Sequence, residues 1–225
     1  MSVPIGWQAS AYVIAAMCGC WYWESGLNPG VWEGLEDLRE TMGEAAWSYV
    51  YQYEGVGGFG LGQWTNTYNQ YTEQYSMRLL NLHQYVTNPE HNYGDGDGEG
   101  QLRFVIHENA WLNSSQSRLG YTSLYEFINS DSTNLEDLVW DFLANWEGVA
   151  GDHYQERVEN AQEFLECIIT HIADDPSTFH WFSYNGYPTE ESKVNNLMMI
   201  WNWWGNGERP FIRMKRHRLP IWMYI

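Results

Sequence analysis

The chain opens with an apolar run whose spacing predicts a buried helix. Between residues 11 and 23 the apolar side chains recur every three or four positions, as on one face of an α-helix. Ser25-Gly26 followed by Asn28-Pro29 is typical of a helix end, so we expect this helix to end at about Glu24. The positions that carry the pattern are Ala11, Ile14, Ala15, Cys18, Trp21 and Tyr22.

The same region has to be weighed as a targeting segment, because residues 1–23 carry no charged side chain. A secretory signal peptide starts with positive charge, which is absent here. A membrane-spanning helix needs ~20 continuously apolar residues, whereas Pro4, Gly6, Gln8 and Ser10 leave only residues 11–23 apolar. We therefore expect neither a signal peptide nor a membrane span.

Further along, the apolar spacing predicts helices over residues 102–112, 123–129, 135–146 and 153–172. Thr133-x-x-Glu136 and Asp152-x-x-Gln155 resemble capping boxes at two of the helix starts. A short β-hairpin is expected around residues 50–66, which include a run rich in glycine. The fold class predicted is α+β, predominantly helical, with a small β-hairpin lobe.

A composition break at Asp174-Asp175-Pro176 predicts a domain boundary, with one domain over residues 1–172 and an extension over residues 173–225. The extension is rich in tryptophan, and five of the eleven basic residues of the chain lie between Arg209 and Arg218. This pattern favours a segment that docks on an acidic or apolar surface. An arm packed onto its own domain fits the composition equally well.

Composition and charge narrow the function classes. The chain has 225 residues and a net charge of −18, which repels a phosphate backbone and argues against nucleic acid as a partner. Its 14 Trp, 16 Tyr and 8 Phe exclude a disordered chain. Three cysteines, Cys18, Cys20 and Cys167, cannot pair completely, so we expect buried thiols rather than a disulfide framework.

Several patterns suggest a metal, a nucleotide or a peptidase, and each fails on inspection. The acidic loop Gly94–Gly100 copies the start of an EF-hand loop but has Ile106 where the bidentate Glu belongs, so we interpret it as a flexible hinge, with weak cation binding as the alternative. Residues 55–60 fit Gly-x-Gly-x-x-Gly without a surrounding strand–helix unit. The histidines lack zinc-site spacing, and the cysteines lie in apolar helices, so we expect no metal and no cofactor.

Glu24 is the residue that points to chemistry. A carboxylate at the C-terminal end of an apolar helix faces the negative end of the helix dipole and loses hydration beside rings such as Trp21. Both effects are expected to raise its pKa. A protonated Glu near neutral pH is what a general acid needs in order to protonate the leaving oxygen of a glycosidic bond.

Two segments stand out, Glu24-Ser25-Gly26-Leu27-Asn28-Pro29-Gly30-Val31-Trp32 and Gly58-Phe59-Gly60-Leu61-Gly62-Gln63-Trp64-Thr65. Together they resemble the lysozyme-like superfamily, and most closely the phage tail lysozymes. Further similar elements follow in order, and the resemblance covers roughly residues 8–170. It implies a lysozyme-like fold with Glu24 as the catalytic acid. The later elements are Glu108-Asn109-Ala110-Trp111-Leu112, the short helix 123–128 and Phe142-Leu143-Ala144-Asn145-Trp146-Glu147, with Arg157 and Ala161 downstream.

The resemblance also implies that residues 58–65, called the glycine-rich element below, line a sugar cleft. Gly60, Gln63, Trp64 and Thr65 are then the substrate-binding residues, with glycine letting the backbone approach a sugar and the indole offering a stacking face. Trp64 as an ordinary core residue is the alternative.

The second carboxylate is not identifiable from the sequence. Glu54, immediately before Gly55, and Asp37 are the candidates to inspect first, and each also fits a solvated surface charge. The chain further departs from the family in having Gly148-Val149 where Arg-Pro usually follows the Glu at position 147. A different turn is expected there.

Taken together, the residues and the resemblance predict a glycoside hydrolase that cleaves the β-1,4 bond between N-acetylmuramic acid and N-acetylglucosamine in peptidoglycan. We expect it in the virion, on the phage tail, acting on the host cell wall during genome entry and docked to other tail proteins through its C-terminal segment. Two alternatives stay open. They are a non-catalytic tail protein that retains the fold, and a lytic transglycosylase.

Overall fold

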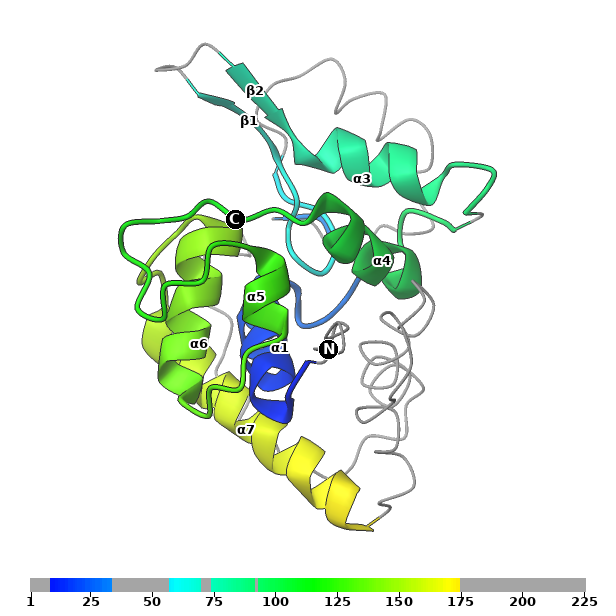
Figure 1. The fold of residues 1–225 in the computed structure, drawn as a ribbon. Coiled ribbons are helices and arrows are strands. Elements are labelled where there is room, and N and C mark those ends of the chain that lie inside the picture. Colours follow the sequence, from blue (N-terminus) through cyan, green and yellow to red (C-terminus); the bar gives the residue numbers. More distant parts are fainter. Residues whose placement is uncertain (1–8, 34–56, 70–73, 92, 175–225) are drawn as a thin grey trace, which may run out of the picture. The chain divides into compact units, whose positions relative to one another are not determined.

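The computed structural model describes residues 9–33, 57–69, 74–91 and 93–174 (Figure 1). The described residues are mostly helical with one small antiparallel hairpin, which confirms the predicted class. The elements are α1 (Ala11–Ser25), β1 (Asn66–Asn69), β2 (Gln74–Met77), α3 (Arg78–Val86), α4 (Gly98–Glu108), α5 (Leu124–Ile128), α6 (Leu135–Phe142), the π-helical turn η1 (Leu143–Glu147) and α7 (Tyr154–Asp174).

The described residues fall into two compact units. One, the helical unit, comprises residues 9–23 and 105–174. The other, the hairpin unit, comprises residues 24–33, 57–69, 74–91 and 93–104. The boundary predicted after residue 172 lies at the end of the described part of the chain and stays a prediction.

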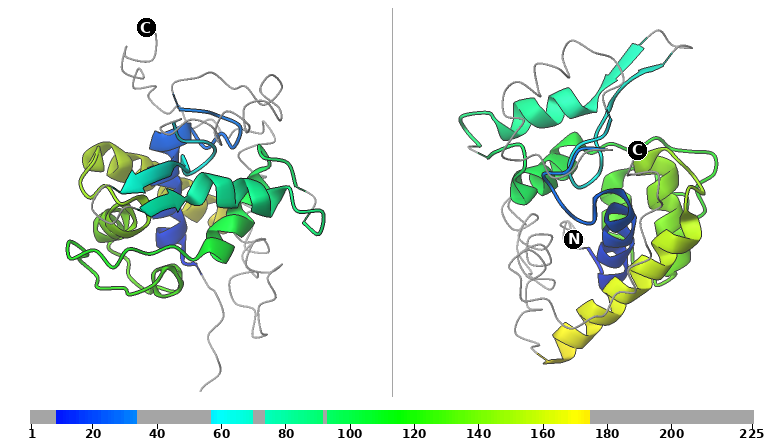
Figure 2. Two further views of the ribbon diagram at one scale, coloured as in Figure 1. Left: turned by 90° about the horizontal axis from the view of Figure 1, so that it is seen from above. Right: turned by 180° about the vertical axis from the view of Figure 1, so that it is seen from behind.

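Helix α1 is the buried element of the helical unit, and its residues Val13–Trp21 are all buried. It lies alongside α6 and α7 (Figures 1 and 2). The Trp21 ring packs edge-on against Phe142 and Trp146, at centroid distances of 5.8 and 5.6 Å. A helix that is apolar all round is stable only when it is enclosed, which explains why the run predicted from sequence became a core helix. Among the described residues, no helix is long and apolar enough to cross a membrane.

Two features set the contact between α1 and α7. A Cβ added at Gly19 would lie 2.7 Å from the backbone nitrogen of Ala161, so the two helices approach more closely there than any other residue would allow. The guanidinium of Arg157 is buried and donates to the carbonyl of Cys20 at 3.1 Å and to the carboxylate of Asp152 at 3.2 Å. A buried cation is tolerated because these acceptors replace its water.

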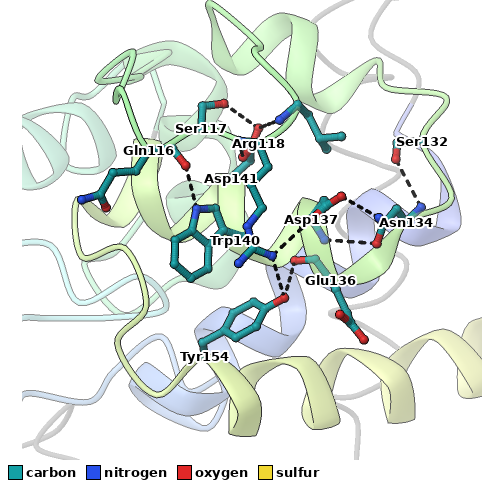
Figure 3. Close-up of polar contacts among 11 residues, drawn as sticks. Gln116, Ser117, Arg118, Ser132, Asn134, Glu136, Asp137, Trp140, Asp141 and Tyr154 are labelled. Carbon is teal, nitrogen blue, oxygen red and sulfur yellow. Dashed lines mark hydrogen bonds and ion pairs between the residues drawn. The ribbon is translucent and has the colours of Figure 1, made fainter.

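The loop before α5 is fastened to α6 by one buried carboxylate (Figure 3). Asp141 is 0% exposed, and its carboxylate accepts a hydrogen bond from the Ser117 hydroxyl. It also accepts from the backbone N–H groups of Arg118 and Leu119. The Arg118 guanidinium lies 3.8 Å from the centroid of the Trp140 ring and donates to Asp137 and Tyr154. Polar contacts therefore hold this loop against the helical unit, in addition to the packing of its apolar core.

Helix starts differ in detail from the sequence prediction. The side chain of Asn134, not Thr133, caps α6 by accepting from the N–H of Asp137. Ser123, which the sequence analysis did not name as a cap, caps α5 by accepting from the N–H of Glu126. Asn is as good a cap as Thr or better, and the two adjacent polar residues made the sequence signal ambiguous by one position.

The hairpin unit contains the only regular sheet in the described residues, and it lies further along the chain than predicted. Strands β1 and β2 pair antiparallel with Asn66 opposite Met77 and Asn69 opposite Gln74, whereas the hairpin was expected around residues 50–66. The described part of the expected region instead holds isolated bridges that join Phe59 to Trp32 and to Trp64.

The acidic loop of residues 94–100 is not a hinge in the structure. Helix α4 begins at Gly98, inside the loop, and the carboxylate of Asp97 accepts from the N–H of Gly100 at 3.1 Å. The Asp95 carboxylate lies 2.7 Å from Nδ1 of His83. The interpretation as a flexible linker was therefore wrong, because two of its carboxylates hold ordered structure.

Candidate functional site

Glu24 lies in the last turn of α1 and is half-buried. The helix ends at Ser25 because the two residues after it, Gly26 and Leu27, have positive φ angles of 60° and 57°. Glycine adopts this conformation freely, whereas a leucine there is strained and persists only where the surroundings hold it. The side chain of Asn28 then accepts from the N–H of Gly30 at 3.0 Å. The segment after Glu24 is thus a tight, ordered turn.

The second motif forms a small ladder of three short backbone segments. Phe59 exchanges hydrogen bonds with Trp64 on one side, at 3.1 and 3.0 Å. On the other side, the N–H of Gly60 donates to the carbonyl of Val31 at 2.9 Å, and the N–H of Glu33 donates to the carbonyl of Gly58 at 2.8 Å. The ladder places the glycine-rich element directly beside the end of the segment that begins at Glu24.

A side-chain hydrogen bond next to Glu24 also links the two motifs. The hydroxyl of Ser25 donates to the carbonyl of Leu61 at 2.9 Å, across 36 positions of sequence. Since Ser25 follows Glu24 directly, the catalytic candidate and the glycine-rich element meet in the hairpin unit. This is the spatial relationship on which a sugar site built from both motifs depends.

The four residues expected to bind substrate have different environments. Gly60 is buried with φ +76°, and its N–H and carbonyl are both engaged within the ladder and its turn, so its role in the structure is conformational. Gln63 and Thr65 are half-buried, and the Gln63 side-chain amide donates to the Gly60 carbonyl at 2.8 Å. Trp64 is 1% exposed and packs edge-on against Phe104, so its indole is a core group and offers no stacking face.

The two candidates for a second carboxylate, Glu54 and Asp37, lie outside the described residues. Within them, the structure places a different carboxylate on the ladder. Glu33 is exposed, and its Oε2 accepts from the N–H of Gly58 at 2.8 Å. The sequence analysis did not single out Glu33, since nothing in its neighbourhood of the sequence marks a contact 25 positions away.

Gln101 is the second residue that the sequence analysis missed. It is 0% exposed and lies on α4. Its side-chain nitrogen donates to the carbonyls of Pro29 and Asp95, each at 2.7 Å, and its oxygen accepts from the N–H of Leu61 at 2.9 Å. The one signal in the sequence is a polar residue on the face of α4 that otherwise carries Phe104 and Val105.

The described residues hold no group of three or more His, Cys, Asp or Glu side chains that could bind a metal ion. The loop that copies the start of an EF-hand has its carboxylates bound to His83 and to the start of α4. Burial raises the pKa of the Cys18 thiol to about 12 and that of Cys167 to about 11. Neutral thiols are poor nucleophiles, so these two fit structural roles.

A family model described as phage tail lysozyme matches residues 1–168. The matched range contains Glu24, the glycine-rich element and every helix of the described chain up to most of α7.

Proposed function

Because the chain belongs to the phage tail lysozyme family, a family of phage-associated, lysozyme-like peptidoglycan hydrolases, we propose that it hydrolyses the β-1,4 bond between N-acetylmuramic acid and N-acetylglucosamine. Glu24 is the catalytic acid of this proposal. The bond and the residue both go beyond what family membership establishes, and the geometry of the hairpin unit supports them.

The chemistry assigned to Glu24 is proton transfer to the glycosidic oxygen. As the bond to the anomeric carbon breaks, the leaving oxygen gains negative charge, and a proton delivered at that moment lowers the barrier. The position of Glu24 fits the task, because a half-buried carboxyl can keep one side dry while the other faces a substrate. Water completes the reaction at the anomeric carbon.

The observation that carries the proposal is the hydrogen bond from Ser25 to Leu61. A general acid acts only when it is held within reach of the oxygen it protonates. The 2.9 Å contact fixes the end of α1 to the glycine-rich element, and so holds Glu24 beside the backbone that the family resemblance assigns to the sugar.

The half-buried side chains of Gln63 and Thr65 are the polar groups proposed to contact the sugar. The Gln63 amide is oriented by its bond to the Gly60 carbonyl, and Gly60 shapes the turn that presents it. Trp64 is left out of the substrate contacts because it is buried.

The identity of the second carboxylate decides the stereochemistry. Carboxyl groups about 5–5.5 Å apart serve a retaining mechanism, and groups about 6.5–9.5 Å apart leave room for the water of an inverting one. Glu54 and Asp37 are the proposed candidates. A lytic transglycosylase needs no second carboxylate, because a hydroxyl of the substrate itself attacks the anomeric carbon.

We further place the protein on the phage tail, where it opens the host wall locally for genome entry. A free lysozyme gains from positive charge in finding anionic wall polymers. This chain carries −18, so it fits delivery by a particle better than diffusion. The basic, tryptophan-rich segment of residues 173–225 is proposed to dock on other tail proteins.

A zymogram on purified peptidoglycan tests the proposal. Wild type is expected to clear the substrate, Glu24→Gln to leave it intact, and Glu163→Gln, a half-buried helical glutamate of α7, to behave as wild type. Mass spectrometry of the released fragments is expected to show reducing ends.

The other outcomes assign the alternatives. Fragments with 1,6-anhydro ends identify a lytic transglycosylase. If wild type clears nothing while remaining folded, the protein is a structural or docking component that retains the fold.

A further inference from the structure

Gln101 holds together three backbone segments that are far apart in sequence. Its amide group makes bonds to Pro29, Leu61 and Asp95, at 2.7, 2.9 and 2.7 Å, and each partner is a main-chain atom. A buried amide is tolerated in a protein core only when its hydrogen bonds are made. Gln101 is 0% exposed and has both of its donors and its acceptor engaged.

Two of the three segments are the motifs of the proposed site. Pro29 closes the turn that begins at Glu24, and Leu61 is the centre of the glycine-rich element. Leu61 is held from both ends, since its N–H donates to Gln101 and its carbonyl accepts from Ser25. The glycine-rich element is therefore tied to the segment after Glu24 by the amide of Gln101, which lies outside the family motifs, as well as by Ser25 and the backbone ladder.

The neighbouring glycine is matched to this amide. A Cβ added at Gly60 would lie 2.5 Å from Oε1 of Gln101 and 2.6 Å from its Nε2. The amide of Gln101 occupies the space that a side chain at position 60 would fill, so the glycine and the glutamine form one packed unit.

We propose that Gln101 is a positioning residue for glycosidic cleavage: its amide sets the position of the glycine-rich element against the turn after Glu24. The proposal rests on the function proposed above. Gln101 does not touch the reacting atoms, and it acts through Leu61 and Pro29. A shift of about 1 Å in a reacting group can cost ~10²-fold in rate, so loss of the amide is expected to lower kcat by up to that factor while KM changes little.

Two substitutions test this role. Gln101→Met keeps the volume and removes all three hydrogen bonds. Gln101→Glu keeps an acceptor for Leu61 and, when ionised, has no donor for Pro29 or Asp95. At acidic pH the carboxyl group carries a proton and regains one donor, so the kcat of this variant is expected to recover towards wild type as the pH falls. Because protonation of a buried carboxylate also restores stability, the folded fraction of this variant is measured at each pH, and the recovery is expected in kcat per folded molecule relative to wild type at the same pH.

Asp97→Ala is the matched control. It removes the bond from the Gly100 N–H to Asp97 at the start of the same helix and no bond to Pro29 or Leu61. The measurements are kcat and KM on soluble peptidoglycan fragments, the pH profile, and thermal unfolding. The inference predicts that the Gln101 variants lose much more kcat than Asp97→Ala does, after correction for the folded fraction.

The results separate the two proposals. If wild type is active, Glu24→Gln is inactive and the Gln101 variants match Asp97→Ala in kcat, the positioning role is overturned and the proposed function stands. If wild type is inactive, or Glu24→Gln is as active as wild type, the proposed function fails and this inference fails with it. Should Gln101→Met not fold, the pH profile of Gln101→Glu decides alone: a profile parallel to wild type overturns the inference.

Discussion

The hydroxyl of Ser25 lies 2.9 Å from the carbonyl oxygen of Leu61 and donates its hydrogen bond there. This contact joins the residue after Glu24 to the glycine-rich element, 36 positions away in the sequence, and it adds to the backbone ladder that holds the same two motifs together. It is also the contact most easily removed, because alanine differs from serine by that one group.

Ser25→Ala is therefore expected to impair catalysis more than stability. Loss of one such hydrogen bond costs about 0.5–1.5 kcal/mol, whereas freeing the end of α1 is expected to lower kcat by roughly tenfold, within the range that misplacement of a reacting group produces. Steady-state kinetics and thermal unfolding measure the two effects. Ser132→Ala, which removes the bond accepted from the N–H of Asn134 in the helical unit, is expected to lose similar stability and retain kcat.

A paired glycine substitution tests the packing around Gly60. Gly60 and Gly120 have nearly equal φ angles of +76° and +73°, but a Cβ at Gly60 would meet Gln101 whereas a Cβ at Gly120 would meet nothing within 4 Å. Each alanine is expected to cost about 1–2 kcal/mol for its backbone conformation. Gly60→Ala should cost a further ~1–3 kcal/mol for overpacking. Urea denaturation measures both, and equal costs would show that the space beside Gln101 is not filled.

Glu33 can act as an anchor of the ladder or as a catalytic carboxylate, and two variants distinguish these. Glu33→Gln retains an acceptor for the N–H of Gly58, and Glu33→Ala removes it. We expect the anchor role, so the glutamine variant should keep most of the activity and the alanine variant should lose it. An inactive Glu33→Gln with unchanged thermal stability would instead identify Glu33 as the second carboxylate.

The buried thiols predict a loss of stability at alkaline pH. Burial, together with the smaller effect of the charge of Cys167, raises the pKa of Cys18 from 9.0 to about 12. A thiol of the unfolded chain ionises near pH 9, while the folded one stays neutral, so the unfolded state gains stability as the pH rises above 9. The contribution of Cys18 is complete below pH 9 and is lost between about pH 9 and pH 12.

Thermal unfolding of wild type and Cys18→Ala as a function of pH measures this effect. The alanine variant is expected to be less stable at neutral pH because of the cavity, yet to lose less stability than wild type on going above pH 9. Parallel curves would contradict the assignment.

The successes and failures of the sequence analysis have physical reasons. The end of α1 was predicted to within one residue, because Gly26 and Pro29 interrupt a uniformly apolar run. The hairpin was misplaced, because its strands read Asn-Thr-Tyr-Asn and Gln-Tyr-Ser-Met and show no alternation of apolar and polar side chains. Glycine content suggested a hinge at residues 94–100, yet the hydrogen bonds of Asp95 and Asp97 outweigh the flexibility of the glycines there.

The site was predicted only as far as its motifs. Glu24 and the glycine-rich element stand out because of their residue types, but their meeting through Ser25 is a tertiary contact. Glu33 and Gln101 escaped notice for the same reason, since each acts on backbone atoms at least 25 positions away. A pattern of side chains carries little information about which carbonyl a distant amide will reach.

The contacts of Gln101 also bear on the order in which the protein is made. The chain separations are 72 residues to Pro29 and 40 to Leu61. During translation, Glu24 and the glycine-rich element leave the ribosome well before the amide that fastens them together. Loop closure over such separations is slow compared with local helix formation, so the contacts of Gln101 are expected to form after the helices of the nascent chain. The segments around Glu24 and the glycine-rich element can therefore be fastened to Gln101 only after nearly half of the 225 residues have been made.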